Sequence, residues 1–240
     1  MCTVTYLPTS KNNFILTSSR DVPFAREKAL FPKEYIENNI KITYPKDGKA
    51  GGTWIGSSEK NRLICLLNGG FKNHYLTTDP NTKYRKSRGI IVLDLLKEED
   101  IHSALSEINL DQIEPFTLVI VDWNTELQLL EFVWDGKTKH LKKLPQEMHI
   151  WSSATLYDDT MKAQRKKWFK KWQNIICPED ISDKDLNLVQ ANRILNFHHQ
   201  AGVGNPEIDV IMKREKVGTV SITQVVKLND EITMDYEEVN

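Results

Sequence analysis

The 240-residue sequence has no long hydrophobic run and no excess of charge of one sign. Its longest apolar stretches, such as residues 63–67 and 118–121, are far below the about 20 residues that a transmembrane helix requires. Residues 1–6 lack the basic and apolar regions of a secretory signal. Lys and Arg total 32 against 33 Asp and Glu, which gives no general reason for a nucleic-acid partner. We therefore expect a cytoplasmic protein without integral membrane association.

Cysteine is also scarce, with only Cys2, Cys65 and Cys177 and no CxxC pair. This odd number argues against a disulfide framework and suits a reducing compartment. The six histidines show no metal-ligand spacing, because the adjacent His198 and His199 diverge by about 100° on a predicted helix. Serine-hydrolase, zinc-protease and nucleotide-loop motifs are absent. The sequence thus predicts no metal and no cofactor.

The first half of the sequence has the alternation and turn residues of β-hairpins. Strands are expected at residues 3–7, 14–19, 53–56 and 62–67. The first two form a hairpin over residues 2–20, and an irregular stretch lies between Pro23 and Pro32. Asn68 and the two glycines after it end the fourth strand.

Apolar residues at helical spacing mark the second half, together with a three-stranded meander. Helical spacing covers residues 90–108, on both sides of an acidic break at 98–100, and residues 158–176 and 182–199. Further strands are expected at residues 116–122, 127–134, 138–144, 208–212 and 219–227. Because strand and helix blocks are segregated, we predict a layered α+β fold in a single domain, residues 1–240.

Residues 162–172, KAQRKKWFKKW, interleave basic and aromatic side chains. One interpretation is a contact with a membrane surface or nucleic acid. The alternative, which we favour, is an amphipathic helix. Its apolar face would hold Met161, Trp168, Trp172 and Ile176, and its solvent face Lys166, Lys167, Lys170 and Lys171.

Cys2 is a candidate nucleophile because of its position. Initiator methionine is generally removed before so small a residue, which would leave Cys2 with a free α-amino group. A cysteine thiol is only about 3% thiolate at pH 7, whereas an α-amino group with a pKa of about 7.7–8.0 is a base suited to neutral pH. One residue can then supply both nucleophile and base.

The predicted hairpin brings polar residues toward Cys2. If Pro8 pairs with Phe14, Cys2 faces Arg20, whose charge would hold the thiolate or a substrate oxygen. Asp21 can accept a hydrogen bond from the α-ammonium group. A one-residue slip would turn Arg20 to the other face, and an ordinary surface pair is the alternative for Arg20 and Asp21. Asn68 is a candidate oxyanion donor or, alternatively, a simple turn residue.

Residues 151–155 precede a predicted helix and contain two serines, Ser152 and Ser153. Their hydroxyl groups are candidates for contacting a substrate. They are equally placed to cap the helix that follows.

Several blocks in order along the chain resemble the NRDE family, which includes the transport-and-Golgi-organisation proteins. The most specific are Met1-Cys2-Thr3 and the Gly-Gly-Thr-Trp-Ile-Gly sequence of residues 51–56. The others are residues 19–22 with Arg26, 67–68, 87–89, 115–116, 151–153 and 218–219 with Ser221 and Thr223. The resemblance covers almost the whole chain.

This family is similar to the N-terminal-nucleophile hydrolases, so the resemblance implies a four-layer αββα sandwich. It also implies amidohydrolase or acyltransferase activity on the carbon–nitrogen bond of a small amide or acyl substrate. Its catalytic residues would be Cys2, Arg20, Asp21 and Asn68. The matching blocks further suggest substrate contacts from Arg26, Trp54, Arg88, Ser152 and Ser153.

The sequence departs from the family pattern at Ser19, Val22 and Val220. Polar residues of the family are replaced there, so outer contacts of the site are expected to be lost. The alternative function is a non-enzymatic carrier of lipid or haem, which keeps the cleft without turnover. The oligomeric state does not follow from the sequence.

Overall fold

The computed structural model describes residues 3–10, 12–79, 81–176 and 183–239. The chain divides into two compact units. The first contains Met1–Arg26, Glu147–Ser152 and Tyr157–Asn240, and the second contains Glu27–Gln146 and Ser153–Leu156. The single-domain organisation stays a prediction.

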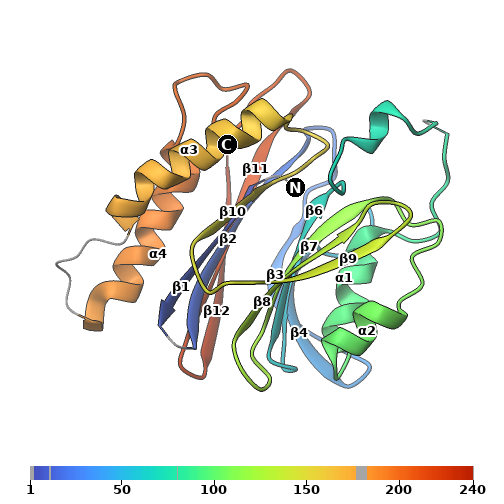
Figure 1. The fold of residues 1–240 in the computed structure, drawn as a ribbon, viewed down its shortest axis with the longest axis horizontal. Coiled ribbons are helices and arrows are strands. Elements are labelled where there is room, and N and C mark those ends of the chain that lie inside the picture. The colour runs from blue at the N-terminus through green and yellow to red at the C-terminus, as the bar shows by residue number, and fades with distance from the viewer. Residues whose placement is uncertain (1–2, 11, 80, 177–182, 240) are drawn as a thin grey trace. The chain divides into compact units, whose positions relative to one another are not determined.

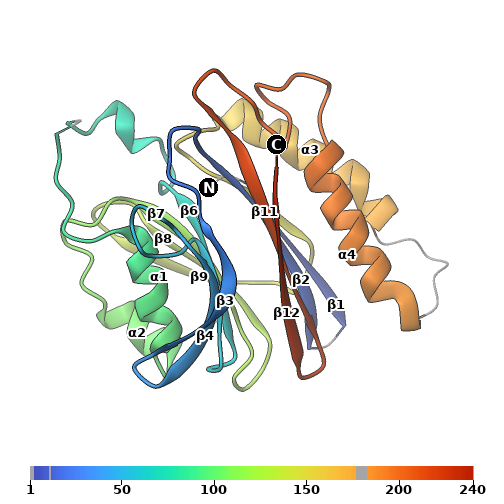
Figure 2. The same cartoon turned by 180° about the vertical axis from the view of Figure 1, so that it is seen from behind.

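The first unit is built on a five-stranded antiparallel sheet in the order β10-β1-β2-β11-β12. Its strands are β1 (Thr3–Ser10), β2 (Asn13–Pro23), β10 (His149–Ser152), β11 (Val217–Leu228) and β12 (Glu231–Glu238). Two helices, α3 (Asp159–Ile176) and α4 (Asp183–Gln200), pack together on one face of this sheet (Figures 1 and 2).

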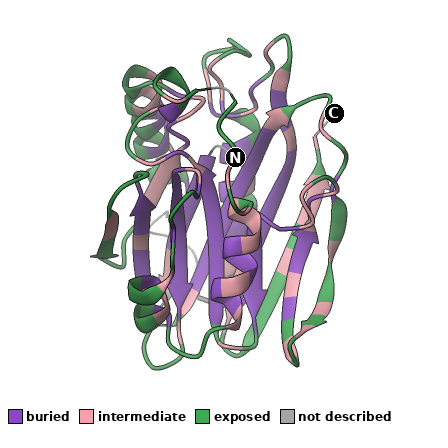
Figure 3. Ribbon diagram, turned by 90° about the vertical axis from the view of Figure 1, so that its right-hand side faces the viewer, coloured by how far each residue is buried: buried purple, intermediate pink, exposed green. Residues whose placement is uncertain are grey.

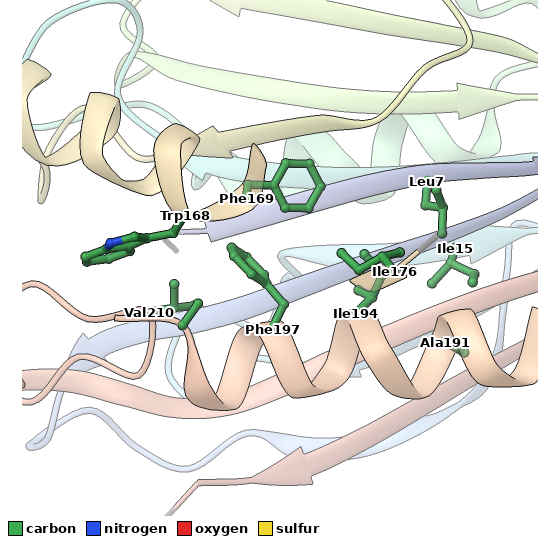
Figure 4. Packing of buried hydrophobic residues seen from close by; sticks show 10 residues of the cluster. Leu7, Ile15, Trp168, Phe169, Ile176, Ala191, Ile194, Phe197 and Val210 are labelled. Carbon is green, nitrogen blue, oxygen red and sulfur yellow. The ribbon is translucent and has the colours of Figure 1, made fainter. Parts of the chain in front are cut away.

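The register of the first hairpin agrees with the sequence-based prediction. Thr3 pairs with Ser19 and Pro8 pairs with Phe14, so the numbers of facing residues sum to 22. Side chains alternate between the two faces of a strand, which places Leu7 and Ile15 on the face covered by the helices. Figure 4 shows these two residues beside the helix residues Ile176 and Ile194.

The amphipathic interpretation of residues 162–172 is confirmed. The Trp168 side chain is 6% exposed and packs in the core with Phe169 and Ile176, while Trp172 is half-buried against the same cluster. The four lysines of this stretch, Lys166, Lys167, Lys170 and Lys171, are all exposed. The helix therefore uses its indoles for packing and its lysines for solvation.

The second unit contains a seven-stranded antiparallel sheet, β3-β4-β5-β6-β7-β8-β9. Its strands are β3 (Leu30–Glu37), β4 (Ile40–Lys46), β5 (Ile55–Ser58), β6 (Arg62–Asn68), β7 (Phe116–Asp122), β8 (Gln128–Trp134) and β9 (Lys139–Leu144). Its helices are η1 (His74–Leu76), α1 (Arg88–Lys97) and α2 (Ile101–Glu107), and α1 packs on β5 and β6. Figure 3 shows that burial is concentrated in the strands, whereas the connecting loops are mostly exposed.

Arg62 joins this sheet to the end of α1. Its side chain is 1% exposed, and its Nε donates to Asp122 Oδ2 at 2.9 Å. Its Nη1 donates to the carbonyl oxygens of Leu95 and Glu98 at 3.0 and 2.6 Å. The last carbonyl groups of a helix have no intrahelical donor, so the buried guanidinium satisfies them while it pairs with a buried carboxylate.

The predicted α+β class is confirmed, with two antiparallel sheets, the four α-helices α1–α4, and the second hairpin and meander in place. The predicted strand at residues 208–212 is wrong, because this segment forms turns in which the Ile208 amide donates to the Asn205 carbonyl. The irregular stretch after Pro23 ends at Leu30, where β3 begins and includes Pro32. Strands β3, β4, β10 and β12 were not predicted.

Candidate functional site

Arg20 and Asp21 lie near the end of β2 and are both buried, with 3% and 2% of their surfaces exposed. They are therefore not the ordinary surface pair that the sequence left open. Successive residues of a strand point to opposite faces, so the two side chains serve different environments. Asp21 shares the face of Ser19 and Ile15 that the helices cover, and Arg20 lies on the other face.

The Asp21 carboxylate is fixed by two hydroxyl groups. Tyr157 donates to Oδ2 at 2.5 Å, and Thr219 donates to Oδ1 at 2.6 Å. Tyr157 precedes α3 and Thr219 belongs to β11, so these hydrogen bonds connect β2 to two other parts of the first unit. Such charge-assisted bonds are stronger than neutral ones, and this carboxylate fixes the local structure.

Arg165 of α3 holds the beginning of β1. Its buried side chain donates through Nη1 to the hydroxyl of Thr3, the first described residue of the chain. Its Nη2 donates to the carbonyl oxygen of Asp209 at 2.6 Å, and its guanidinium lies 3.7 Å from the centre of the Tyr157 ring. No sequence pattern distinguished Arg165 from the other basic residues of α3.

His198 connects α4 to the same hairpin and is fully buried. Its Nδ1 lies 2.7 Å from Ser19 Oγ, and its Nε2 lies 2.9 Å from Thr5 Oγ1. Burial lowers the pKa of His198 to about 3, and the positive charge of Arg165 acts in the same direction. The neutral imidazole is thus a hydrogen-bonded link between α4 and the two strands.

This link predicts acid sensitivity. The unfolded chain binds a proton at His198 near pH 6.5, whereas the folded protein does so only near pH 3, so stability is lost as the pH falls through this interval. Between pH 7 and pH 5, the free energy of unfolding should fall by about 2 kcal/mol more in the wild type than in His198→Gln. Urea titrations of both proteins at the two pH values measure the difference, and parallel losses would contradict it.

The face of the sheet that carries Arg20 also carries three buried hydroxyl groups. Ser221 of β11 faces Arg20, and Thr223 faces Ser18 across the same pair of strands. Ser18, Ser221 and Thr223 have 0% exposed surface, and within the described part of the chain their hydroxyl oxygens have no hydrogen-bond partner. Buried polar groups are almost always satisfied, so such a cluster suits a bound polar molecule or water.

Val220, one of the departures from the family pattern, is the extra residue of a β-bulge. The pairing of β11 with β2 shifts between Thr219, which faces Asp21, and Ser221, which faces Arg20. A bulge redirects side chains and is frequent next to functional sites. Here it allows Thr219 to reach Asp21 on one face while Ser221 lies beside Arg20 on the other.

Asn68 is the last residue of β6, in the second unit, and is half-buried. Its carbonyl oxygen accepts a hydrogen bond from Ser153 Oγ at 2.9 Å, and Gly69 continues the chain with a φ of 83°. The Ser153 hydroxyl also lies 3.0 Å from Thr155 Oγ1.

The alternative that Ser152 and Ser153 cap the following helix is wrong. Asp158 caps α3 by accepting a hydrogen bond from the Met161 amide.

The other predicted substrate contacts differ in their surroundings. Arg88, the first residue of α1, pairs with Glu114 at 3.0 Å and donates to the Pro115 carbonyl at 3.1 Å. Trp54 is 2% exposed in the second unit, whereas Arg26 is half-buried in the first. Arg88 therefore has a structural task, and its role as a substrate ligand stays a prediction.

Ser152 ends β10, where it pairs with Thr3 of β1. It therefore lies in the first unit, beside the first described residue of the chain. Cys2 itself lies outside the described residues, so its predicted pairing with Arg20 is not tested.

The sequence profile of the family described as Transport and Golgi organisation 2 matches residues 1–229. The chain belongs to this family. A search of curated proteins gave no match.

Among solved structures, this member of the Transport and Golgi organisation 2 family is similar to an N-acylethanolamine-hydrolysing acid amidase orthologue of Caenorhabditis elegans. The TM-score is 0.63 at 14% identity, and the match covers 95% of this chain and 94% of the other. This likeness shows the fold, which is that of N-terminal-nucleophile hydrolases.

Two structures of the conjugated bile acid hydrolase of Clostridium perfringens also match. In the first an arginine is replaced by leucine, and in the second a cysteine is replaced by alanine. Their TM-scores are 0.48 and 0.47 at 12% and 10% identity. The first match covers 99% of this chain and 96% of the other, and the second covers 100% and 97%.

Searches for other kinds of site gave two negative findings. Within the described ranges, no group of three or more His, Cys, Asp or Glu side chains is placed to hold a metal ion. No helix in the described part of this family member is long and apolar enough to cross a membrane.

Proposed function

We propose that this family member hydrolyses a carbon–nitrogen amide bond with Cys2 as the nucleophile, after removal of Met1. The observation that carries the proposal is the register of β1 and β2, in which Thr3 pairs with Ser19. Continued by one residue, this register would pair Cys2 with Arg20, on the face that holds the three unpartnered hydroxyl groups. The fold shared with an amide-hydrolysing enzyme supports the same chemistry.

The proposed reaction has two stages. The Cys2 α-amine takes the thiol proton, and the sulfur attacks the amide carbonyl carbon to form a tetrahedral oxyanion. The ammonium then protonates the leaving nitrogen, the carbon–nitrogen bond breaks, and a thioester remains on Cys2. Water, deprotonated by the freed amine, attacks the thioester, releases the carboxylic acid and returns a proton to the sulfur.

In this proposal the polar residues have separate tasks. The Arg20 guanidinium favours the thiolate, because a positive charge stabilises a neighbouring anion. Ser18, Ser221 and Thr223 offer hydrogen bonds to polar atoms of the substrate. Asp21 fixes the end of β2 through Tyr157 and Thr219, and a hydrogen bond to the α-ammonium group stays a prediction. Asn68 stays the predicted oxyanion donor.

The experiment is to trap the acyl-enzyme on the processed protein. Intact-mass measurement should find a chain that begins at Cys2. Brief incubation with N-acyl amides and activated acyl esters, followed by acid quenching and peptide mapping, should place the acyl group on the Cys2 peptide.

A matched control keeps the thiol but moves the base. A variant with one glycine inserted between Met1 and Cys2 retains the cysteine, yet its free amine belongs to another residue. We expect this variant to lose acylation by unactivated amides. Equal acylation of both proteins would refute the proposed base. Binding of acyl amides without any acylation would support the carrier alternative instead.

A further inference from the structure

The first unit contains a cavity of about 420 Å³ between α4 and the strands β11 and β12. It lies on the helix-covered side of the sheet, because Gln224 in its wall pairs with Thr17 on that face. It is therefore separate from the Arg20 face used in the proposed function. Its volume falls within the range of about 300–1,000 Å³ that is usual for small-molecule sites.

The inner wall of the cavity is apolar. Ala191 and Leu195 contribute from α4, and Ile222 and Val226 contribute from β11. Leu188 also lines it from the helix side, with 67% of its surface exposed. A hydrocarbon chain in this space would remove apolar surface from water on both partners, which favours binding.

Two acceptor groups of the wall are unused. The Asp235 side chain has no hydrogen-bond or ion-pair partner among the described residues, and Asn187 Oδ1 is buried with no partner among them. The side-chain amide nitrogen of Gln224 is not available to a ligand, because it donates to Thr17 Oγ1 at 2.9 Å and to the Ala191 carbonyl at 3.0 Å. A ligand that brings its own donors can therefore use these two acceptors.

The charged residues that line the cavity are acidic. Asp235 and Glu237 are its acidic residues, and no lysine or arginine of the described ranges lines it. Glu237 accepts from His199 Nε2 at 2.5 Å, whereas Asp235 has no such neighbour within those ranges. A cationic group would find a complementary field here, and an anion would not.

We propose that this cavity binds an amphiphilic cation, a primary alkylammonium with a short hydrocarbon chain. The chain lies on Ala191, Leu195, Ile222 and Val226, and the ammonium group donates to Asp235 and to Asn187 Oδ1. An ammonium group has three donors and no acceptor, which matches the unused acceptors of the wall. The proposal does not depend on the amidase chemistry proposed above.

Calorimetric titration with octylammonium, octanoate and octyl glucoside below their micellar concentrations tests this on the full chain. We expect octylammonium to bind at least about tenfold more tightly than the other two compounds. Asp235 is exposed, so Asp235→Asn should keep the fold and lower octylammonium affinity about tenfold. Asp111→Asn, at an exposed carboxylate of the second unit, should leave the affinity unchanged.

A second variant tests the apolar wall. Leu195→Trp reduces the free volume and should weaken octylammonium and octyl glucoside alike, with thermal unfolding confirming that the variant is folded. The proposal is overturned if octanoate binds as well as octylammonium. It is also overturned if Asp235→Asn leaves the octylammonium affinity unchanged, or if the wild type binds none of the three compounds.

Discussion

Replacement of Cys2 by alanine should abolish amide hydrolysis, lowering kcat/KM by at least about a thousandfold, because the variant has no nucleophile. The fold should persist, since so small a side chain leaves little void when it is shortened. Initial rates with the amide found by acyl-enzyme trapping measure the loss. Circular dichroism and thermal unfolding confirm that wild type and variant are equally folded.

Cys65 supplies the matched control within the chain. It is fully buried in β6, where its thiol belongs to the core of the second unit. Cys65→Ala should therefore lower the free energy of unfolding by about 1 kcal/mol and leave hydrolysis intact. A limiting amount of an alkylating reagent should label Cys2 before Cys65, because burial in apolar surroundings disfavours the thiolate.

Retained activity in the Cys2→Ala variant would favour the carrier alternative over the hydrolase. If Cys2→Ala retains the activity of the wild type in cells, the thiol is not the working group. The family assignment and the fold would then stand, and the carrier alternative would replace the hydrolase.

Turn residues and apolar alternation predicted the elements whose structure depends on neighbouring residues in the sequence. The first hairpin was predictable because Pro8 and Phe14 flank a short turn segment and the alternation of the strands fixes their register. Strand β12 was missed because it is an edge strand, mostly polar and exposed, so it shows little apolar alternation. Residues 208–212 have a strand-like composition, yet the carbonyl groups of Ile208 and Asp209 accept from Arg165 instead of from a neighbouring strand.

The site divides in the same way. Arg20 and Asp21 could be predicted as site residues because they stand in the hairpin whose register follows from local alternation. The sequence suggested His198 only as a possible metal ligand. Its hydrogen-bond partners are far away along the chain, since Thr5 precedes it by 193 positions and Ser19 by 179. Arg165 likewise reaches Thr3 across 162 positions. Contacts at this separation leave no periodic pattern, and only the packing of α3 and α4 on the sheet brings them together.

Substitution of Asp21 by alanine should lower the free energy of unfolding by about 3–5 kcal/mol. The carboxylate is 2% exposed and accepts hydrogen bonds from the hydroxyl groups of Tyr157 and Thr219, so its removal breaks two buried hydrogen bonds. Asp21→Asn keeps the volume and an acceptor oxygen, and should lose about half as much. Urea unfolding at pH 7 gives both values, and Asp111→Asn, at an exposed carboxylate, should change stability by less than about 0.5 kcal/mol.

Double-mutant cycles can show whether Asp21 stabilises the fold through its hydrogen bonds to Tyr157 and Thr219 or only through its charge. In a double-mutant cycle, Asp21→Ala and Tyr157→Phe should couple by about 1–2 kcal/mol, because each removes one side of the same 2.5 Å hydrogen bond. Thr219→Val should couple with Asp21→Ala in the same sense, through the 2.6 Å bond to the other carboxylate oxygen. Tyr157 and Thr219 donate to different oxygens of Asp21. Tyr157→Phe should therefore leave the Thr219 hydrogen bond intact, and Thr219→Val should leave the Tyr157 hydrogen bond intact. Additive losses in both cycles would mean that Asp21 stabilises the unit through neither hydroxyl group.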